Sequence, residues 1–215
     1  VKYMQNKNQP IFWLIIIITL MVSTWGIIQI ATPKSSGSTI VTDQEWINGN
    51  PEASVSLIEY SDFQCSACII YYSNTKRLIE EFADDIQIIF RHYPLPSIHP
   101  QAELAAQAAE AAGQQNKFWE MHNMLFDNQQ SWSGNSKAKD TFISYAQQLG
   151  LDIEKFTNDL EHKDIKNAIR DDKISGDQAL IEGTPTFFLN GKKINNPRSY
   201  DKFRQLITTE LTKIQ

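Results

Sequence analysis

Cysteine is scarce in this sequence, and its scarcity narrows the chemistry that the protein can perform. Only two of the 215 residues are cysteines, and they form a single Cys65-Ser66-Ala67-Cys68 unit. With no other thiol, the chain can close no other internal disulfide. A structural zinc site typically needs four Cys or His ligands that arrive as two pairs, and no two histidines have the H-x3-5-H spacing. The sequence therefore disfavours zinc and predicts no metal site.

An excess of positive charge is also absent. The chain has 20 Lys and Arg residues against 25 Asp and Glu residues, a net charge of −5, and its pI is near 5.4. Nucleic-acid binding needs a basic face, so the composition predicts no nucleic-acid partner. A chain of this length can form one substantial domain with an appendage, or two small domains.

Charge of either sign is missing from residues 11–30, which are predominantly apolar. About 20 residues of helix cover roughly 30 Å, the thickness of the hydrocarbon core of a bilayer. Trp13 and Trp25 lie near the two ends, where amphipathic rings favour the headgroup region. The pattern predicts a transmembrane anchor at 11–30, after a tail at 1–10 and before a polar linker at 31–50.

The flanks of this segment predict its orientation. Lys2 and Lys7 precede it, and Lys34 is the first charge of the polar flank that follows. Because positive residues favour the cytoplasmic side, the tail is expected in the cytoplasm and the rest of the chain outside. A cleaved signal peptide is the alternative, but its apolar region usually has about 7–15 residues, and no clear A-x-A cleavage site occurs around Ala31.

The order of the later elements indicates one α/β domain. Val55–Tyr60 and Ile86–Phe90 read as strands on either side of a helix at Ile69–Phe82, and this βαβ order favours parallel strands. The remaining predicted elements are helices at Gln101–Ala112, Lys117–Phe126, Ala138–Leu149, Ile153–Leu160 and Lys163–Leu180, a strand at 183–191 that turns into Lys192–Asn195, and a helix at Ser199–Lys213. Residues 51–215 are therefore expected to form one domain with a helical insertion at about 97–181.

The position of the two cysteines predicts a redox site. They follow a strand and open a helix, where residues three apart lie on one face and can close a small, reversible ring. Cys65 would face free backbone N–H groups and the positive end of the helix dipole, which favours the thiolate, the nucleophile of disulfide exchange. Cys68 would be its buried partner. A purely structural disulfide is a poor alternative, because so small a ring removes little entropy from the unfolded chain.

Glu59 is the candidate proton acceptor for Cys68. It alternates with Val55 and Leu57, which places a carboxylate on an apolar face of the strand. A buried carboxyl has a raised pKa, which suits proton exchange with a thiol; the alternative is a solvated side chain at the end of the strand. Structural roles, such as capping and partial burial, are expected for the histidines at positions 92, 99 and 122.

Four stretches of the sequence resemble the DsbA-like branch of the thioredoxin superfamily. They are residues 59–68 around the cysteines, Phe90-Arg91-His92-Tyr93-Pro94-Leu95 with His99-Pro100, residues 115–122, and Gly183-Thr184-Pro185-Thr186-Phe187. The resemblance implies a thioredoxin fold with an inserted helical domain that exchanges disulfides with thiol-containing client proteins and needs no cofactor. It also implies a location in the cell envelope and a DsbB-like membrane redox partner, although an anchor is a feature of some members only. Together with the predicted anchor at 11–30, the expected location is the bacterial cytoplasmic membrane, with the catalytic domain facing the periplasm or cell exterior.

The resemblance also assigns roles around the cysteines. It implies that Pro185 follows a cis peptide bond, that the Thr184 backbone pairs with an extended substrate, and that the Thr184 hydroxyl contacts Cys65. Ser66 and Ala67 complete the expected substrate-binding set, but they depart from the proline and histidine that strong oxidants of the family often carry there. Oxidation of secreted proteins is the first expectation; a reductase or isomerase, and a non-catalytic binding module, are the alternatives.

Overall fold

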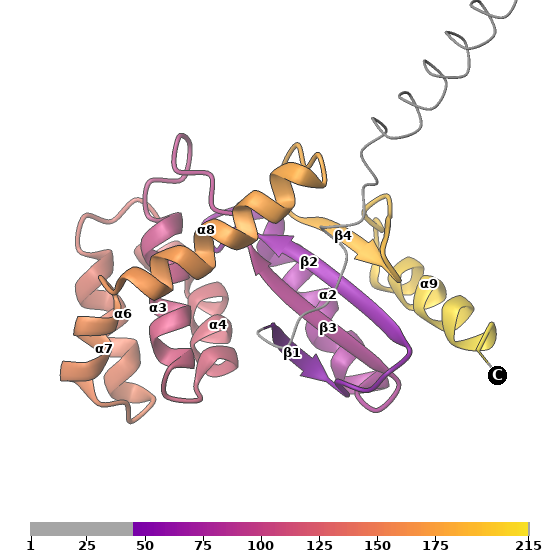
Figure 1. The fold of residues 1–215 in the computed structure, drawn as a ribbon, viewed down its shortest axis with the longest axis horizontal. Coiled ribbons are helices and arrows are strands. Elements are labelled where there is room, and N and C mark those ends of the chain that lie inside the picture. The colour runs from indigo at the N-terminus through magenta and orange to yellow at the C-terminus, as the bar shows by residue number, and fades with distance from the viewer. Residues whose placement is uncertain (1–44, 215) are drawn as a thin grey trace, which may run out of the picture. The chain divides into compact units, whose positions relative to one another are not determined.

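The computed structural model describes residues 45–214 of the chain (Figure 1). The predicted tail at 1–10, the predicted anchor at 11–30 and most of the predicted linker at 31–50 lie outside these residues. Within the described part, no helix combines the length and apolar character that crossing a membrane requires.

Five strands in the described residues form one mixed sheet in the order β1-β3-β2-β4-β5. The strands are β1 (Trp46–Gly49), β2 (Val55–Ser61), β3 (Ile86–His92), β4 (Thr186–Leu189) and β5 (Lys192–Lys193). The central pair, β2 and β3, is parallel, and every other pairing is antiparallel. Helix α2 (Ser66–Phe82) connects this pair, which confirms the predicted βαβ unit.

A set of helices is inserted between β3 and β4, as predicted. It contains α3 (Ala102–Gly113), α4 (Phe118–Asp127), the short α5 (Gln129–Trp132), α6 (Ala138–Gln148), α7 (Ile153–Asp159) and α8 (Lys163–Gln178). Most of α3 is buried alanine, whose small side chain lets neighbouring helices approach closely. In Figure 1, α8 runs from the helical insertion across to the sheet, and α9 (Tyr200–Thr212) ends the described chain.

The two faces of the sheet pack against different helices. Because alternate residues of a strand point to opposite faces, Val55 and Leu57 of β2 share one apolar cluster with α2 and α9. Tyr60 lies on the other face, where its hydroxyl is 2.8 Å from the Ser175 hydroxyl of α8. Every odd-numbered residue of β2 is therefore directed toward α2, including Glu59 and Ser61 at the end of the strand that precedes the cysteines.

The predicted linker is wrong at its C-terminal end, because residues 46–49 form β1 at the edge of the sheet. Trp46, the first residue of β1, connects the sheet to the helical insertion. Its ring stacks on Phe118 with 4.2 Å between centroids, and its indole N–H donates to Glu110 at 2.7 Å. A four-residue strand is too short to show an alternation in the sequence. The contacts of β1 are with residues far away in the chain.

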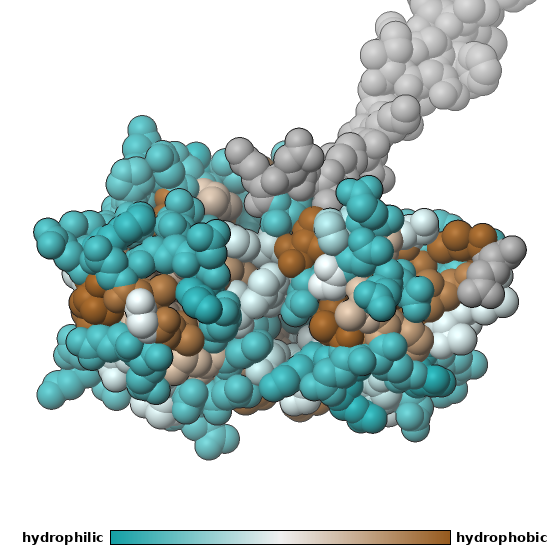
Figure 2. All heavy atoms as spheres, turned by 90° about the horizontal axis from the view of Figure 1, so that it is seen from below, coloured by the Kyte–Doolittle hydropathy of each residue, from teal (hydrophilic) through white to brown (hydrophobic). Residues whose placement is uncertain are grey.

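The surface is mainly hydrophilic on the face shown in Figure 2, with separate hydrophobic patches between polar side chains. The most exposed large hydrophobic side chains of the described residues include Ile70 at 64%, Ile98 at 67% and Leu180 at 78%. Each belongs to a segment that leads into the cysteine site.

Candidate active site

The two cysteines lie where β2 gives way to α2. Cys65 is the N-cap residue of α2, with extended backbone angles, and Cys68 closes the first turn by donating its backbone N–H to the Cys65 carbonyl at 3.1 Å. Cys65 keeps 9% of its surface exposed, whereas Cys68 has none, and both thiols are free. Both cysteines are thus buried, with Cys65 the more exposed of the two and Cys68 fully enclosed.

The two thiols differ in their pKa values. A hydrogen bond from the Cys68 thiol, helped by the backbone N–H groups of Ala67 and Cys68, lowers the pKa of Cys65 from 9.0 to about 5. Burial, followed by the neighbouring Cys65 sulfur, raises the pKa of Cys68 well above 9.0. At neutral pH, Cys65 is therefore a thiolate that accepts from the start of the helix, and Cys68 keeps its proton.

The loop before β4 packs against the nucleophile. The Thr184–Pro185 peptide bond is cis, and the Cys65 sulfur lies 3.4 Å from the Thr184 carbonyl oxygen, to which the thiol donates a hydrogen bond when it is protonated. The Thr184 hydroxyl is buried without a hydrogen bond of ordinary length to a described residue, but it also helps to lower the Cys65 pKa. The sequence anticipated this contact through the hydroxyl, and the carbonyl is the closer partner.

Ser66 and Ala67 lie at the surface beside Cys65. The Ser66 side chain is exposed and Ala67 is half-buried, so both are open to a molecule that approaches the sulfur of Cys65. Their contact with a substrate stays a prediction.

Two side chains that the sequence reading missed hold the cysteine loop in place. The Asp62 carboxylate accepts from the backbone N–H of Gln64 at 2.7 Å and of Leu95 at 2.9 Å, and it contacts His99 Nδ1 at 2.8 Å. The Gln129 amide of α5 donates to the carbonyls of Phe63 and Cys65 at 2.8 and 2.9 Å. Asp62 follows the strand directly, which is a signal for such a turn; nothing in the sequence marks Gln129.

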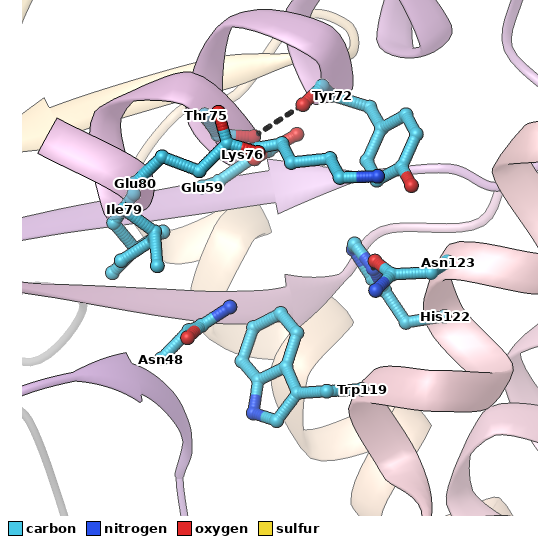
Figure 3. Close-up of a pocket in the computed structure, with 11 residues that line it drawn as sticks. Asn48, Glu59, Tyr72, Thr75, Lys76, Ile79, Glu80, Trp119, His122 and Asn123 are labelled. Carbon is cyan, nitrogen blue, oxygen red and sulfur yellow. Dashed lines mark hydrogen bonds between the residues drawn. The ribbon is translucent and has the colours of Figure 1, made fainter. Parts of the chain in front are cut away.

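Glu59 is buried on the apolar face, as predicted, with 3% of its surface exposed. Burial raises its pKa from 4.5 to about 7. Its carboxyl group reaches a pocket of about 240 Å³ between α2 and α4. Figure 3 shows Glu59 behind Lys76 of α2, with Trp119 and His122 of α4 on the opposite side.

The three histidines have structural positions, as predicted. His92 Nε2 contacts the Glu110 carboxylate at 2.9 Å, and His99 pairs with the Asp62 carboxylate. Burial lowers the pKa of His122 to about 3, so its ring is neutral at physiological pH. No group of three or more His, Cys, Asp or Glu side chains among residues 45–214 is arranged to hold a metal ion.

Comparison with known proteins assigns the chain to a family. Residues 41–209 match the family model described as Thioredoxin, which covers the sheet, the cysteine site and the helical insertion.

The chain belongs to the thioredoxin family.

Curated relatives of this thioredoxin-family chain carry a transporter name. It is 34% identical over 184 residues to "Na(+)/H(+) antiporter NhaA 1" of Salinispora arenicola, a match that covers 86% of this chain and 26% of the relative. A second relative, "Na(+)/H(+) antiporter NhaA 3" of Salinispora tropica, is 33% identical over 178 residues, with 83% and 26% covered. The chain thus spans about a quarter of the length of the curated relatives it matches.

Solved structures show that the fold is the DsbA-like form of the thioredoxin fold. Wolbachia pipientis alpha-DsbA1 superposes with a TM-score of 0.72 at 22% identity, covering 82% of this chain and 96% of that one. Oxidised BdbD from Bacillus subtilis gives 0.70 at 22% identity, covering 78% and 93%. A protein-disulfide isomerase from Novosphingobium aromaticivorans gives 0.67 at 17% identity, covering 80% and 99%.

The thioredoxin-family site has the parts that thiol-disulfide exchange requires. Cys65 is a thiolate that keeps 9% of its surface exposed, and Cys68 is a second thiol one helical turn away that can attack a mixed disulfide or leave from one. The Thr184 backbone beside the cis bond lies next to the reacting sulfur. The carboxyl of Glu59 is buried within the same unit.

Proposed function

We propose that this protein is a thiol-disulfide oxidoreductase that acts on the cysteines of other proteins through a reversible Cys65–Cys68 disulfide. The observation that carries the proposal is the difference between the two thiols: an accessible one with a pKa of about 5 and a buried one that holds its proton. A thiolate that leaves readily, next to a thiol that resolves, is the arrangement that disulfide exchange uses.

The lowered Cys65 pKa favours the oxidising direction. Stabilising the thiolate stabilises the reduced form of the protein relative to the disulfide, so the pair accepts electrons from client thiols more readily. Two members of the thioredoxin superfamily bracket the expectation: thioredoxin, with a pKa of about 7, has a potential near −270 mV, and DsbA, with about 3.5, has one near −120 mV. The Cys65 pKa of about 5 lies between the pKa values of these two proteins. The expected reduction potential therefore lies between about −270 and about −120 mV.

In this direction a client thiolate attacks the Cys65 sulfur of the disulfide, and Cys68 leaves as a thiolate that takes up a proton. A second client thiolate then attacks the client's own sulfur in the mixed disulfide and releases Cys65 as a thiolate. The client gains a disulfide and the protein gains two electrons. The exposed apolar side chains of Ile70, Ile98 and Leu180 provide contacts for an unfolded client segment, and the Thr184 backbone provides a place for it to pair.

The same proposal includes a location. The apolar run at 11–30 and the two lysines before it support a single-pass anchor in the cytoplasmic membrane, with the thiol site on the outer side. Disulfides persist in that compartment. A quinone-coupled DsbB-like membrane protein would then reoxidise the cysteine pair, with secreted or periplasmic proteins as clients. The antiporter names of the curated relatives concern those proteins, of which this chain matches only about a quarter.

The test combines a potential with trapping. The full chain, in mild detergent, is equilibrated with glutathione redox buffers, and the fraction of disulfide is measured by mass spectrometry. A value well above about −270 mV supports the oxidase, and a value at or below it supports a reductase. Cys68→Ser should accumulate mixed disulfides with client proteins, and Cys65→Ser should accumulate none. A Cys65→Ser protein that keeps full biological activity would identify a binding module instead.

A further inference from the structure

Ser61 has a buried hydroxyl that is not hydrogen-bonded within the sheet or the cysteine loop. It is the last residue of β2 and is 1% exposed. Its Oγ is fully buried and makes no hydrogen bond of ordinary length to any residue between 45 and 214. Leaving a buried hydroxyl unpaired is destabilising, so its position calls for an explanation.

The register of β2 places this hydroxyl between two groups that exchange protons. Glu59 and Ser61 are two positions apart and therefore lie on the same face of β2, the face covered by α2. The α2 residues Tyr72 and Thr75 line the pocket that Glu59 enters, and Cys68 lies one turn nearer the start of the helix. Because α2 runs back over β2, its first turn with Cys68 lies over Ser61. The following turns of α2, with Tyr72 and Thr75, lie over Glu59.

Electrostatics agree with this placement. The Ser61 hydroxyl lowers the pKa of the Glu59 carboxyl and, independently, that of the Cys68 thiol, although burial outweighs it in both. No hydrogen bond joins Glu59 directly to Cys68 among the described residues. The Ser61 hydroxyl thus influences both titrating side chains.

The pocket extends the link to solvent. It holds about 240 Å³, enough for several water molecules, and it reaches the surface at Lys76 and Glu80 of α2, which are exposed. The other titratable groups that line it are Tyr72 of α2 and His122 of α4 (Figure 3).

We propose that the Ser61 hydroxyl relays the proton between the Cys68 sulfur and the Glu59 carboxyl, and that the pocket between α2 and α4 connects this carboxyl to bulk water. The inference rests on the proposed disulfide exchange and adds a positioning residue and a proton route to it.

The steps balance in both directions. When a client thiolate attacks Cys65, the S–S bond breaks and its electron pair goes to Cys68. The Ser61 O–H donates a proton to the Cys68 sulfur, the Glu59 carboxylic acid donates one to the Ser61 oxygen, and water in the pocket restores the carboxylic acid. On reoxidation, Cys68 gives its proton to Ser61 and Ser61 gives one to the Glu59 carboxylate. The Cys68 thiolate then attacks the Cys65 sulfur of the mixed disulfide, which forms the Cys65–Cys68 bond and releases the partner's sulfur as a thiolate.

The test measures how fast the oxidised full chain, in mild detergent, is reduced by a cysteine peptide between about pH 6 and pH 9. Ser61→Ala is compared with wild type at each pH, so that the titration of the peptide thiol cancels. Near pH 6, where Glu59 holds a proton, Ser61→Ala should be slower by roughly tenfold or more. Near pH 9, where Glu59 has no proton to give, the two rates should converge. A structural defect would slow the reaction equally at every pH.

The matched control is Ser56→Ala, the same substitution in the same strand at a position that alternation directs to the other face. Its rate should equal that of wild type across the range. Glu59→Gln should show the same loss as Ser61→Ala, and the double variant no greater loss, because both substitutions interrupt one route. Losses that multiply in the double variant would overturn the relay.

The outcomes separate the inference from the proposed function. A wild-type disulfide that the peptide cannot reduce at any pH would overturn both. A reactive wild type with an equally fast Ser61→Ala variant at pH 6 would overturn the relay alone and leave disulfide exchange intact. If Ser61→Ala does not give the far-ultraviolet circular dichroism of wild type, Ser61→Gly removes the same hydroxyl and is judged by the same ratios.

Discussion

Replacing Glu59 with glutamine should make the protein more stable at high pH. In the folded protein, burial holds the Glu59 pKa near 7 instead of 4.5, so unfolding releases a proton between these two values. The unfolded chain binds fewer protons there, and the stability of wild type therefore falls as the pH rises from about 4.5 to about 7. This difference in pKa corresponds to about 3 kcal/mol. A glutamine side chain at this position has no charge and would have no such cost.

The expected gain of Glu59→Gln is therefore close to zero below about pH 4, stays under about 1 kcal/mol at pH 5, and reaches about 3 kcal/mol above about pH 8. For a domain of this size it should raise the melting temperature by about 6–12 °C at high pH. The measurement is thermal unfolding of both proteins with reduced cysteines at pH 5 and pH 9, followed by near-ultraviolet circular dichroism.

Glu80→Gln provides the matched control, since this carboxylate lines the exposed mouth of the same pocket. Its effect should stay within about 0.5 kcal/mol at both pH values. A Glu59→Gln protein with the same stability gain at pH 5 and pH 9, or with a lower melting temperature at pH 9, would refute the argument from burial. Either result would mean that the carboxyl is solvated in the folded protein.

Three further predictions concern the cysteine loop and the edge of the sheet. Thiolate absorbance at 240 nm should appear as the pH rises through about 5 and should be lost in Cys65→Ser, because Cys68 keeps its proton; a first transition near pH 9 would contradict this. Gln129→Ala should cost about 1–3 kcal/mol in urea unfolding, since it removes the side-chain donor to the Phe63 carbonyl and one of the donors to the Cys65 carbonyl; an unchanged midpoint would show that the loop is held otherwise. Gly49→Ala should cost about 1–3 kcal/mol in the same assay, because a Cβ would lie 2.4 Å from a backbone oxygen at a φ of +94°; a stability equal to wild type would exclude that strain.

The elements that could be predicted from the sequence are those that one local pattern decides. Alternating apolar residues defined β2 and β3, and the position of the cysteines between a strand and a helix defined their roles. The same alternation predicted the burial of Glu59, since its neighbours Val55 and Leu57 fix the face. The cis bond before Pro185 had no local signal and came from the family resemblance alone.

Features that depend on contacts between distant segments could not be predicted from the sequence. Trp46–Gly49 is a strand only because β3 offers it an edge and because Phe118 and Glu110 take up its tryptophan. Gln129 serves the cysteine loop across 64 residues of sequence. In the sequence, neither Trp46 nor Gln129 differs from other tryptophan or glutamine residues. Their roles arise only when the helical insertion is folded against the sheet.

The helical insertion therefore does more than enlarge the domain. Helix α5 supplies Gln129, which fixes the carbonyl of the nucleophilic cysteine, and α4 supplies Trp119 and His122, which wall the pocket that Glu59 enters. Without the insertion, the α4 side of this pocket would be open, and water there would weaken the desolvation that raises the Glu59 pKa. The insertion thus contributes to the burial on which the Glu59 pKa depends. In the proposed relay, that pKa sets the pH range in which Glu59 can donate a proton toward Cys68.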